Sequence, residues 1–195
     1  MQYYRDQLES PLGLLTAVLR ESVLYALDYS GSDRLAKLCR RYHGVELSQL
    51  PERPLVGAIR DALSHYFEGD LSCLNQLPVW QGGSSLERSV WATLRQIPPG
   101  STLSYGQLAA KVGHPKASRL VGRINGSNPI GIVVPCHRVI GASGALTGYS
   151  GGLERKAWLL DHEARHTGQS GASELLPTSW ERRTYSRLLG KSDLS

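Results

Sequence analysis

One stretch of the chain, residues 128–140, constrains the rest of the fold more than any other. An apolar run from Ile132 to Val134 predicts a short buried strand, and Pro135 ends it because proline has no N–H for a ladder. Cys136 therefore follows the end of a strand, and His137 and an arginine come directly after it. A cysteine is a nucleophile only as the thiolate, which basic neighbours favour. Taken alone, such a cysteine is more often a small buried hydrophobe, but its polar neighbours favour chemistry.

Further motifs surround this stretch in a fixed order. They are Ser104-Tyr105-Gly106-Gln107-Leu108-Ala109, Arg119-Leu120-Val121-Gly122, Asn128-Pro129, Pro135-Cys136-His137-Arg138-Val139, Gly148-Tyr149-Ser150-Gly151-Gly152 and Trp158-Leu159-Leu160-Asp161-His162-Glu163. In order and spacing they resemble the O6-alkylguanine-DNA alkyltransferases (methylated-DNA–protein-cysteine methyltransferases) over residues 86–165. Several ordered motifs are far more specific than the five residues around the cysteine alone.

The resemblance implies direct-reversal DNA repair. An alkyl group would pass from O6 of guanine, or alternatively from O4 of thymine, to the sulfur of Cys136. The product is a thioether, so each molecule would act once. No cofactor and no metal are expected, because Cys39, Cys73, His43 and His65 show no recognisable zinc spacing.

The same resemblance implies a role for each matching residue near the cysteine. His137 would take the thiol proton through a water molecule, and Glu163 would hold that histidine, which is the logic of a protease triad. Asn128 would brace the loop beside the sulfur. Tyr105 would donate a hydrogen bond to the departing guanine.

Other residues would bind DNA that contains O6-alkylguanine. The target atom is buried in the duplex, so the base must be extruded, and Arg119 matches the arginine that fills the gap. Tyr149 and Ser150 would line the base pocket. Arg123, with Ile124, departs from the small residues usual in the family and would add a phosphate contact.

The distribution of charge agrees with a polyanionic partner. The net charge is +5, yet residues 1–85 carry −2, residues 86–165 carry +6 and residues 166–195 carry +1. A generic solubilising excess would be spread more evenly, whereas a DNA-binding surface concentrates it. Three cysteines without CxxC spacing suit the reducing cytoplasm, and no apolar run is long enough to cross a membrane. We expect a monomer.

The elements predict an α/β domain over residues 1–80, a linker over residues 81–85, a mainly α domain over residues 86–166 and a flexible basic tail over residues 167–195. Periodicity predicts a hairpin (residues 14–19 and 23–29) and helices over residues 33–42, 54–68, 104–112, 116–125, 153–165 and 180–190. Capping boxes predict helix starts at Ser84 and Ser104. The resemblance implies a ribonuclease-H-like sheet in the first domain.

Residues 104–112 and 116–125 are two short helices joined by a glycine-containing turn, which resembles a helix-turn-helix. Lys116, Arg119 and Arg123 would share one face of its second helix, although such a face is more commonly just solvated.

Two other functions fit parts of this pattern. A cysteine hydrolase would use Cys136 and His137 with repeated turnover, but the helix pair and the spacing of Tyr105 and Asn128 argue against it. A DNA-binding lesion sensor without chemistry would have no need of Cys136.

Overall fold

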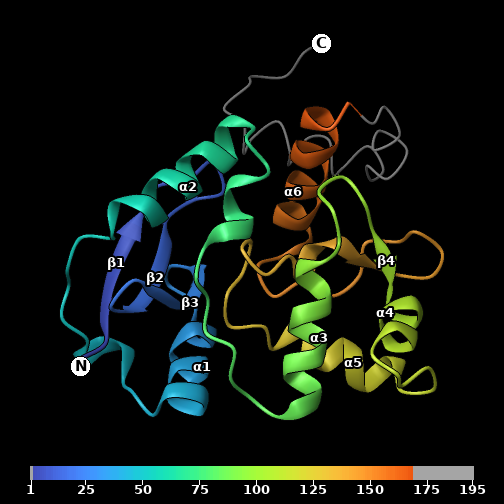
Figure 1. Ribbon diagram of the computed structural model, residues 1–195, viewed down its shortest axis with the longest axis horizontal. Coiled ribbons are helices and arrows are strands. Elements are labelled where there is room, and N and C mark those ends of the chain that lie inside the picture. Colours follow the sequence, from blue (N-terminus) through green and yellow to red (C-terminus); the bar gives the residue numbers. More distant parts are fainter. Residues whose placement is uncertain (1, 169–195) are drawn as a thin grey trace.

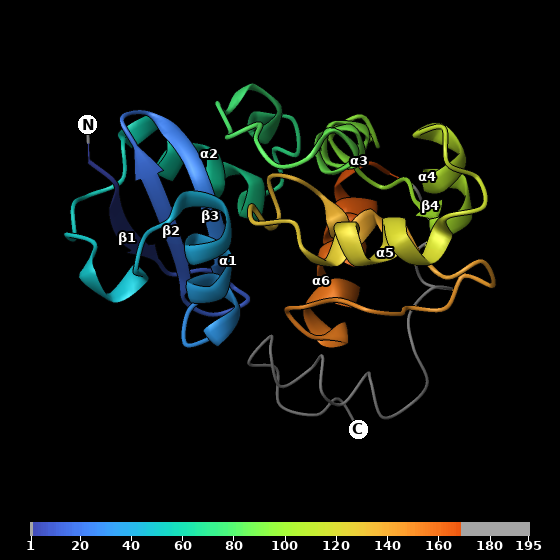
Figure 2. The same cartoon turned by 90° about the horizontal axis from the view of Figure 1, so that it is seen from below.

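The computed structural model describes residues 2–168, which form two halves that lie side by side (Figures 1 and 2). The first half holds a three-stranded sheet and two α-helices, and the second holds four α-helices and a two-stranded sheet. This confirms the prediction of an α/β half followed by a mainly helical half. The helix predicted over residues 180–190 lies outside the described residues, as does nearly all of the predicted tail. Within residues 2–168, no helix is long and apolar enough to span a bilayer.

The first sheet is antiparallel, with its strands in sequence order. They are β1 (Tyr4–Leu8), β2 (Leu15–Arg20) and β3 (Val23–Tyr29). The β2–β3 hairpin confirms the predicted one. β1 was not predicted because three of its five residues are polar, which gives the segment a low strand propensity. Its antiparallel pairing with β2 stabilises the strand instead.

Helices cover both faces of this sheet (Figure 1). α1 (Asp33–His43) covers one face, over a small core of Val18, Ala26, Leu35 and Cys39. α2 (Gly57–Glu68) covers the other face. Two short 3₁₀ helices accompany it: η1 (Leu47–Gln49) lies between α1 and α2 in the chain, and η2 (Cys73–Gln76) follows α2. α1 confirms its prediction, and Gly69 ends α2 as expected, with φ 114°.

The predicted start of α2 at Pro54 is wrong. The helix begins three residues later, at Gly57. The backbone N–H of Leu55 donates to Oδ2 of Asp6 on β1, at 2.8 Å. This bond ties the segment to the sheet and keeps Pro54 outside the helix.

The second half contains the four helices α3 (Ser85–Arg95), α4 (Tyr105–Lys111), α5 (Ser118–Gly126) and α6 (Leu153–His166). Its two-stranded parallel sheet pairs β4 (Leu103–Ser104) with β5 (Val139–Ile140). Both capping boxes are present: Ser84 with Glu87, and Ser104 with Gln107. Helices α4 and α5 pack against each other.

The second basic helix starts later than predicted. α5 begins at Ser118, and Lys116 lies in the preceding turn, which the backbone bond from Ala117 N–H to the His114 carbonyl closes at 2.8 Å. Pro115 disfavours helical geometry at the residue before it. The prediction that Lys116 shares a helical face with Arg119 is therefore wrong.

One hydrophobic core runs through both halves. It joins Leu24 and Leu27 of β3 to Val133 and Val134, which precede the cysteine, and to Leu159 of α6. The active-site segment is thus held from behind by the sheet.

Arg34, at the start of α1, also connects the halves. Its guanidinium pairs with the buried Asp28 carboxylate at 2.5 Å and donates to the carbonyls of Gly126 at 2.9 Å and Asn128 at 2.7 Å. One side chain therefore fixes the end of α5 and the start of the active-site turn to the first half.

Replacing Arg34 with methionine should lower the free energy of unfolding by about 2–3 kcal/mol, because Asp28 would stay buried without its partner. Arg40→Met is the matched control, since Arg40 pairs with Glu46 in an exposed pair, and it should cost less than about 1 kcal/mol. Urea unfolding measures both variants. An equal loss of unfolding free energy in both variants would show that Arg34 does not stabilise the contact between the two halves.

Candidate active site

The segment before Cys136 is a tight turn, so the predicted strand over Ile132 to Val134 is wrong. The Asn128 side chain organises this turn: Nδ2 donates to the carbonyls of Val134 at 2.7 Å and Ile130 at 3.3 Å, and Oδ1 accepts from Ile130 N–H at 3.0 Å. A short run of apolar residues has the same sequence pattern in a buried strand and in a buried turn, so the pattern alone does not distinguish the two. Here the Asn128 side chain satisfies backbone groups within the turn, in addition to the bonds that the turn forms with β3.

The turn also contains strained backbone. Ile132 has φ 67°, a left-handed conformation that β-branched residues rarely adopt and that costs about 1–3 kcal/mol. On its other side, β3 holds the turn through backbone bonds from Leu27 N–H to the Pro129 carbonyl and from Gly131 N–H to the Leu27 carbonyl, at 2.9 and 2.8 Å. The strain is therefore supported by the sheet.

Cys136 begins a 3₁₀ helix, η3 (Cys136–Arg138), that leads into β5. Its two following side chains point to one carboxylate, that of Glu163 near the end of α6. His137 Nε2 lies 2.8 Å from Glu163 Oε1, and Arg138 donates through Nε to Oε2 at 2.9 Å and through Nη2 to Oε1 at 2.8 Å. Tyr66 of α2 adds a fourth bond, from its hydroxyl to Oε1 at 2.8 Å.

This buried network fixes the protonation of its members. Burial opposes ionisation of Glu163, yet His137 and the Arg138 guanidinium hold the pKa of Glu163 well below its usual range. Burial lowers the pKa of His137, so its imidazole is neutral at pH 7. A neutral histidine that donates Nε2–H to the carboxylate has a lone pair on Nδ1, which is buried and has no hydrogen-bond partner among the described residues.

The Cys136 thiol itself is buried, with 4% of the residue exposed. Burial raises the pKa of Cys136, and the Asn128 hydrogen bond and the charges of Arg34 and Lys156 only partly oppose it. The neighbouring cations do favour the thiolate, as expected, but burial outweighs them in the resting protein, so the thiol is protonated at neutral pH and needs a base.

Lys156 of α6 is a buried cation that the sequence analysis missed. Its Nζ donates to the carbonyls of Val139 at 2.6 Å and Thr147 at 2.8 Å. Burial lowers the pKa of Lys156 to about 8, and the nearby Cys136 opposes this shift. A signal was available, because the spacing from Lys156 to Leu159 and Glu163 places all three on one helical face.

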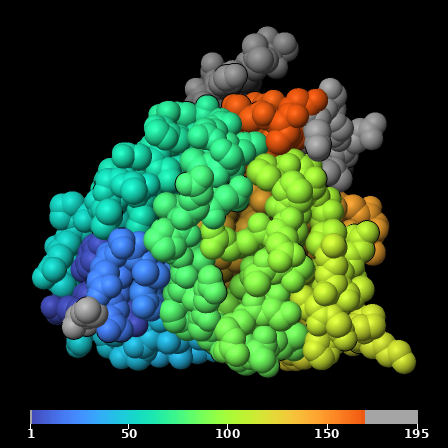
Figure 3. Space-filling model, viewed as in Figure 1, coloured from blue at the N-terminus to red at the C-terminus, as the bar shows by residue number. Residues whose placement is uncertain are grey.

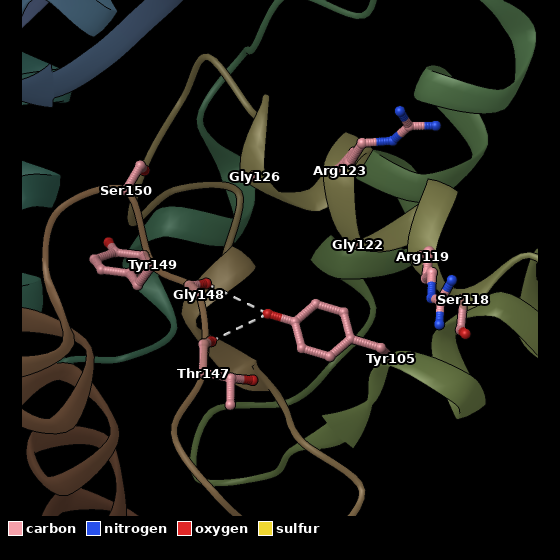
Figure 4. Close-up of a pocket in the computed structure, with 10 residues that line it drawn as sticks. All are labelled: Tyr105, Ser118, Arg119, Gly122, Arg123, Gly126, Thr147, Gly148, Tyr149 and Ser150. Atoms are coloured by element: carbon pink, nitrogen blue, oxygen red, sulfur yellow. Dashed lines mark hydrogen bonds between the residues drawn. The ribbon is translucent and has the colours of Figure 1, made fainter.

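A groove opens on the side of the second half formed by α4, α5 and the loop before α6, with a volume of about 670 Å³. Figure 4 shows its lining, which is Tyr105, Ser118, Arg119, Gly122, Arg123, Gly126, Thr147, Gly148, Tyr149 and Ser150. The Tyr105 hydroxyl points across it to the carbonyls of Thr147 and Gly148, at 3.2 and 3.3 Å (Figure 4).

The structure thus divides the nine predicted site residues into two sets. Tyr105, Arg119, Arg123, Tyr149 and Ser150 line the groove. The other four, Asn128, Cys136, His137 and Glu163, are buried behind it. The cysteine is linked to the groove through α5, which supplies part of the lining: Asn125 Nδ2 on this helix donates to the Cys136 carbonyl at 3.3 Å.

The two arginines of α5 are exposed on the groove, and within residues 2–168 neither side chain forms an ion pair or a hydrogen bond, so their charges face outward. Gly122, between them, lets the helix approach Tyr105, whose ring carbon would lie 3.3 Å from an added Cβ. Ile124 instead points into the core, with 8% exposed. Of the two bulky departures, only Arg123 therefore reaches the groove.

In the first half, Tyr29 of β3 contacts the groove residue Tyr149, although it is buried and is not itself part of the lining. Its hydroxyl lies 3.5 Å from that of Tyr149, and the Arg155 guanidinium lies 4.1 Å from its ring centroid. A Cβ on Gly151 would come within 2.4 Å of the Tyr29 ring, so only glycine fits there. Tyr29 was not predicted as a site residue, since nothing in the hairpin sequence indicates which strand end meets residue 149.

Among residues 2–168, no three His, Cys, Asp or Glu side chains lie together as a metal site would require. The site therefore combines a thiol and an imidazole held by a carboxylate with a basic groove.

Comparisons with known proteins agree with this arrangement. Residues 85–165 match the family model described as the 6-O-methylguanine DNA methyltransferase, DNA binding domain. The methylated-DNA–protein-cysteine methyltransferase of Shigella flexneri is 44% identical over 84% of this chain and 96% of that protein. The protein of the same name from Mycolicibacterium paratuberculosis is 45% identical over 83% and 93%.

Solved structures give the same result for the fold. Mycobacterium tuberculosis OGT in complex with DNA is similar with a TM-score of 0.73 and 36% identity, over 91% of this chain and all of that one. The O6-methylguanine methyltransferase of the same organism has a TM-score of 0.71 and 38% identity, over 85% and 94%.

Proposed function

The chain belongs to the family of methylated-DNA–protein-cysteine methyltransferases, and from this premise we propose that Cys136 is the residue that accepts the alkyl group. The protein repairs O6-alkylguanine in DNA by direct transfer. Two other cysteines lie in residues 2–168, Cys39 in the core under α1 and Cys73 at η2. Neither is near the basic groove, which supports the choice of Cys136.

His137 acts as the base for this thiol. Its free Nδ1 accepts the proton, through a bridging water, while Nε2–H stays bonded to Glu163. The carboxylate then stabilises the imidazolium that forms, as in a protease triad. The support for this relay is the orphaned Nδ1 together with a thiol whose pKa is raised, because such a thiol requires a nearby base.

The transfer is a displacement at carbon. The thiolate attacks the alkyl carbon, a C–S bond forms, the C–O6 bond breaks, and guanine leaves with the electron pair. Tyr105 donates a hydrogen bond to the departing base, exchanging the two carbonyls it now contacts for that ring. The thioether has no leaving route, so each molecule acts once.

The groove receives the base after extrusion from duplex DNA. Arg119 enters the gap in the stack, Arg123 contacts a phosphate, and Tyr149 and Ser150 hold the base. In this proposal α4 and α5 act as a helix-turn-helix, residues 86–166 form the DNA-binding domain, and residues 1–80 form a ribonuclease-H-like support joined through residues 81–85. The protein acts as a monomer.

A stoichiometry measurement tests this function against its rivals. With excess O6-methylguanine duplex, one methyl group should be transferred per protein molecule and no more. Repeated turnover of an ester would instead indicate a cysteine hydrolase. Binding of the duplex without transfer would indicate a lesion sensor.

The proton relay predicts an unusual dependence on pH. Between pH 7 and 9 the single-turnover rate should be flat, because the thiol and the neutral His137 exchange the proton internally. Below pH 6.5 the rate should fall, since the lowered pKa of His137 places its protonation there. Quench-flow kinetics with saturating duplex measures the profile.

In His137→Ala the thiolate must form by loss of the proton to solvent. Its rate should then rise about tenfold per pH unit from pH 7 to 9. Circular dichroism controls for folding of the variant. A flat profile in His137→Ala, or a rising one in the wild type, would remove His137 from the relay.

A further inference from the structure

A second cavity lies away from the DNA groove, between α3 and the segment that leads from η2 into it. It is hollowed in the face of the molecule seen in Figure 3, and its volume is about 400 Å³. Its lining is Asn75, Val79, Trp80, Gln81, Arg88, Trp91, Ala92, Arg95, Gln96 and Val134. It shares no residue with the groove, and the alkyl transfer proposed above does not use it.

Two indole rings give this cavity aromatic walls. The rings of Trp80 and Trp91 have centroids 6.1 Å apart and are inclined at 43°. The Trp91 ring is held directly, because its Nε1 donates to the Ile124 carbonyl at 3.1 Å, and the Trp80 main chain is held by its backbone N–H, which donates to the Leu24 carbonyl at 2.8 Å. The cavity is therefore formed in advance.

The backbone of the connecting segment closes tightly on the first indole. A Cβ on Gly82 would lie 2.0 Å from a ring carbon of Trp80, so this position requires glycine. The backbone of Gly82 therefore packs directly against this ring.

Two arginine side chains also line the cavity. Arg88 donates only to the Gly83 carbonyl, and Arg95 only to the carbonyls of Asn75 and Leu77. No carboxylate is among the lining residues, and neither arginine forms an ion pair with another residue of the described range 2–168. Burial lowers the pKa of Arg95, as expected for a cation without a counter-charge.

We propose that this cavity binds a small planar aromatic molecule that carries one anionic group. The two indoles provide faces and edges for the ring. Free guanidinium donors of Arg88 and Arg95 bind the anionic group, which suits planar, bidentate recognition. A volume of about 400 Å³ is within the ordinary range for small-molecule sites.

The position of the site is close to the active-site turn. Val134 forms part of the lining, and its carbonyl accepts the bonds from Asn128 Nδ2 and from Cys136 N–H. A ligand in this cavity would therefore contact Val134, the residue whose carbonyl Asn128 binds in organising the turn.

Titration calorimetry with 2-naphthalenesulfonate tests the proposal, using the full chain. Binding should be at least tenfold tighter than that of 2-naphthol, which lacks the charge, and of inorganic sulfate, which lacks the ring. Arg88→Gln, an exposed position, should weaken binding about tenfold, the loss of one charge-assisted hydrogen bond. Ala92→Phe, which fills the cavity from the exposed side of α3, should abolish binding.

Arg123→Gln is the matched control, because it removes an exposed helical arginine from the other cavity. It should leave the affinity for 2-naphthalenesulfonate unchanged. No binding by the wild type, equal binding by Ala92→Phe, or weakening by Arg123→Gln alone would each overturn the proposal. None of these results depends on methyl transfer, so the proposed function is tested separately.

Discussion

Replacing Glu163 with alanine is expected to lower the free energy of unfolding by about 3–5 kcal/mol. Its carboxylate accepts five hydrogen bonds: four from the buried side chains of His137, Arg138 and Tyr66, and one from the backbone N–H of Gly100 at 3.3 Å. Removing it leaves the Arg138 guanidinium buried without a counter-charge, and an uncompensated buried charge is among the most costly defects in a protein.

Chemical denaturation at pH 7 measures this loss. Tyr66→Phe is the matched control, because it removes a single hydrogen bond from the same carboxylate and should cost about 1 kcal/mol. The pKa of Glu163 is below its ordinary value, so its stabilisation is present at neutral pH and is lost as the pH falls below about 4. The difference between wild type and Glu163→Ala should therefore narrow in acid. A loss below about 1 kcal/mol at pH 7 would contradict this role.

Replacing Cys136 with alanine should abolish methyl transfer, with a rate at least about 10³-fold below that of the wild type, because no other group in the site supplies a sulfur nucleophile. Affinity for the O6-methylguanine duplex should persist, since the groove residues do not include the cysteine. Transfer of a labelled methyl group and a gel-shift titration measure the two properties.

Cys73→Ala serves as the control for this change, because Cys73 is a half-buried thiol at η2 whose sulfur donates only to the carbonyls of Ala62 and Asp70. It should transfer methyl groups at the wild-type rate. Residual transfer by Cys136→Ala would mean that another residue accepts the alkyl group.

Much of the secondary structure was predictable because its signals are local. Ser84 and Ser104 each form the two reciprocal bonds of a capping box within four residues, so the helix starts could be read from the sequence. Gly69 likewise ends α2 in the left-handed region. Periodicity gave the hairpin and α1 for the same reason.

The errors occurred where distant residues decide the local structure. Ile132 to Val134 form a turn because the Asn128 side chain bonds the Val134 carbonyl and β3 holds the preceding residues Pro129 and Gly131, which an apolar run does not reveal. β1 depends on pairing with β2, and the start of α2 depends on Asp6. Each involves a partner that local propensity does not include.

The candidate site shows the same contrast between features that the local sequence determines and features that depend on distant residues. Cys136 and His137 are adjacent in sequence, but the protonation of the thiol follows from burial, which is a property of the whole fold. Tyr29 contacts the groove residue Tyr149 from a strand about 120 residues earlier in the chain, and no spacing rule connects them. Lys156 lies on the buried face of α6, and its spacing to the apolar residues of that helix was a usable signal. Buried lysines are rare, so the spacing alone did not lead to a prediction.

The central claim is that the alkyl group ends on one sulfur, and peptide mapping by mass spectrometry tests it most directly. After incubation with an O6-methylguanine duplex, the peptide containing Cys136 should carry one methyl group, and those containing Cys39 and Cys73 should carry none. A methyl group on either of those two cysteines, or an unmodified Cys136 peptide after the duplex has been repaired, would contradict the account.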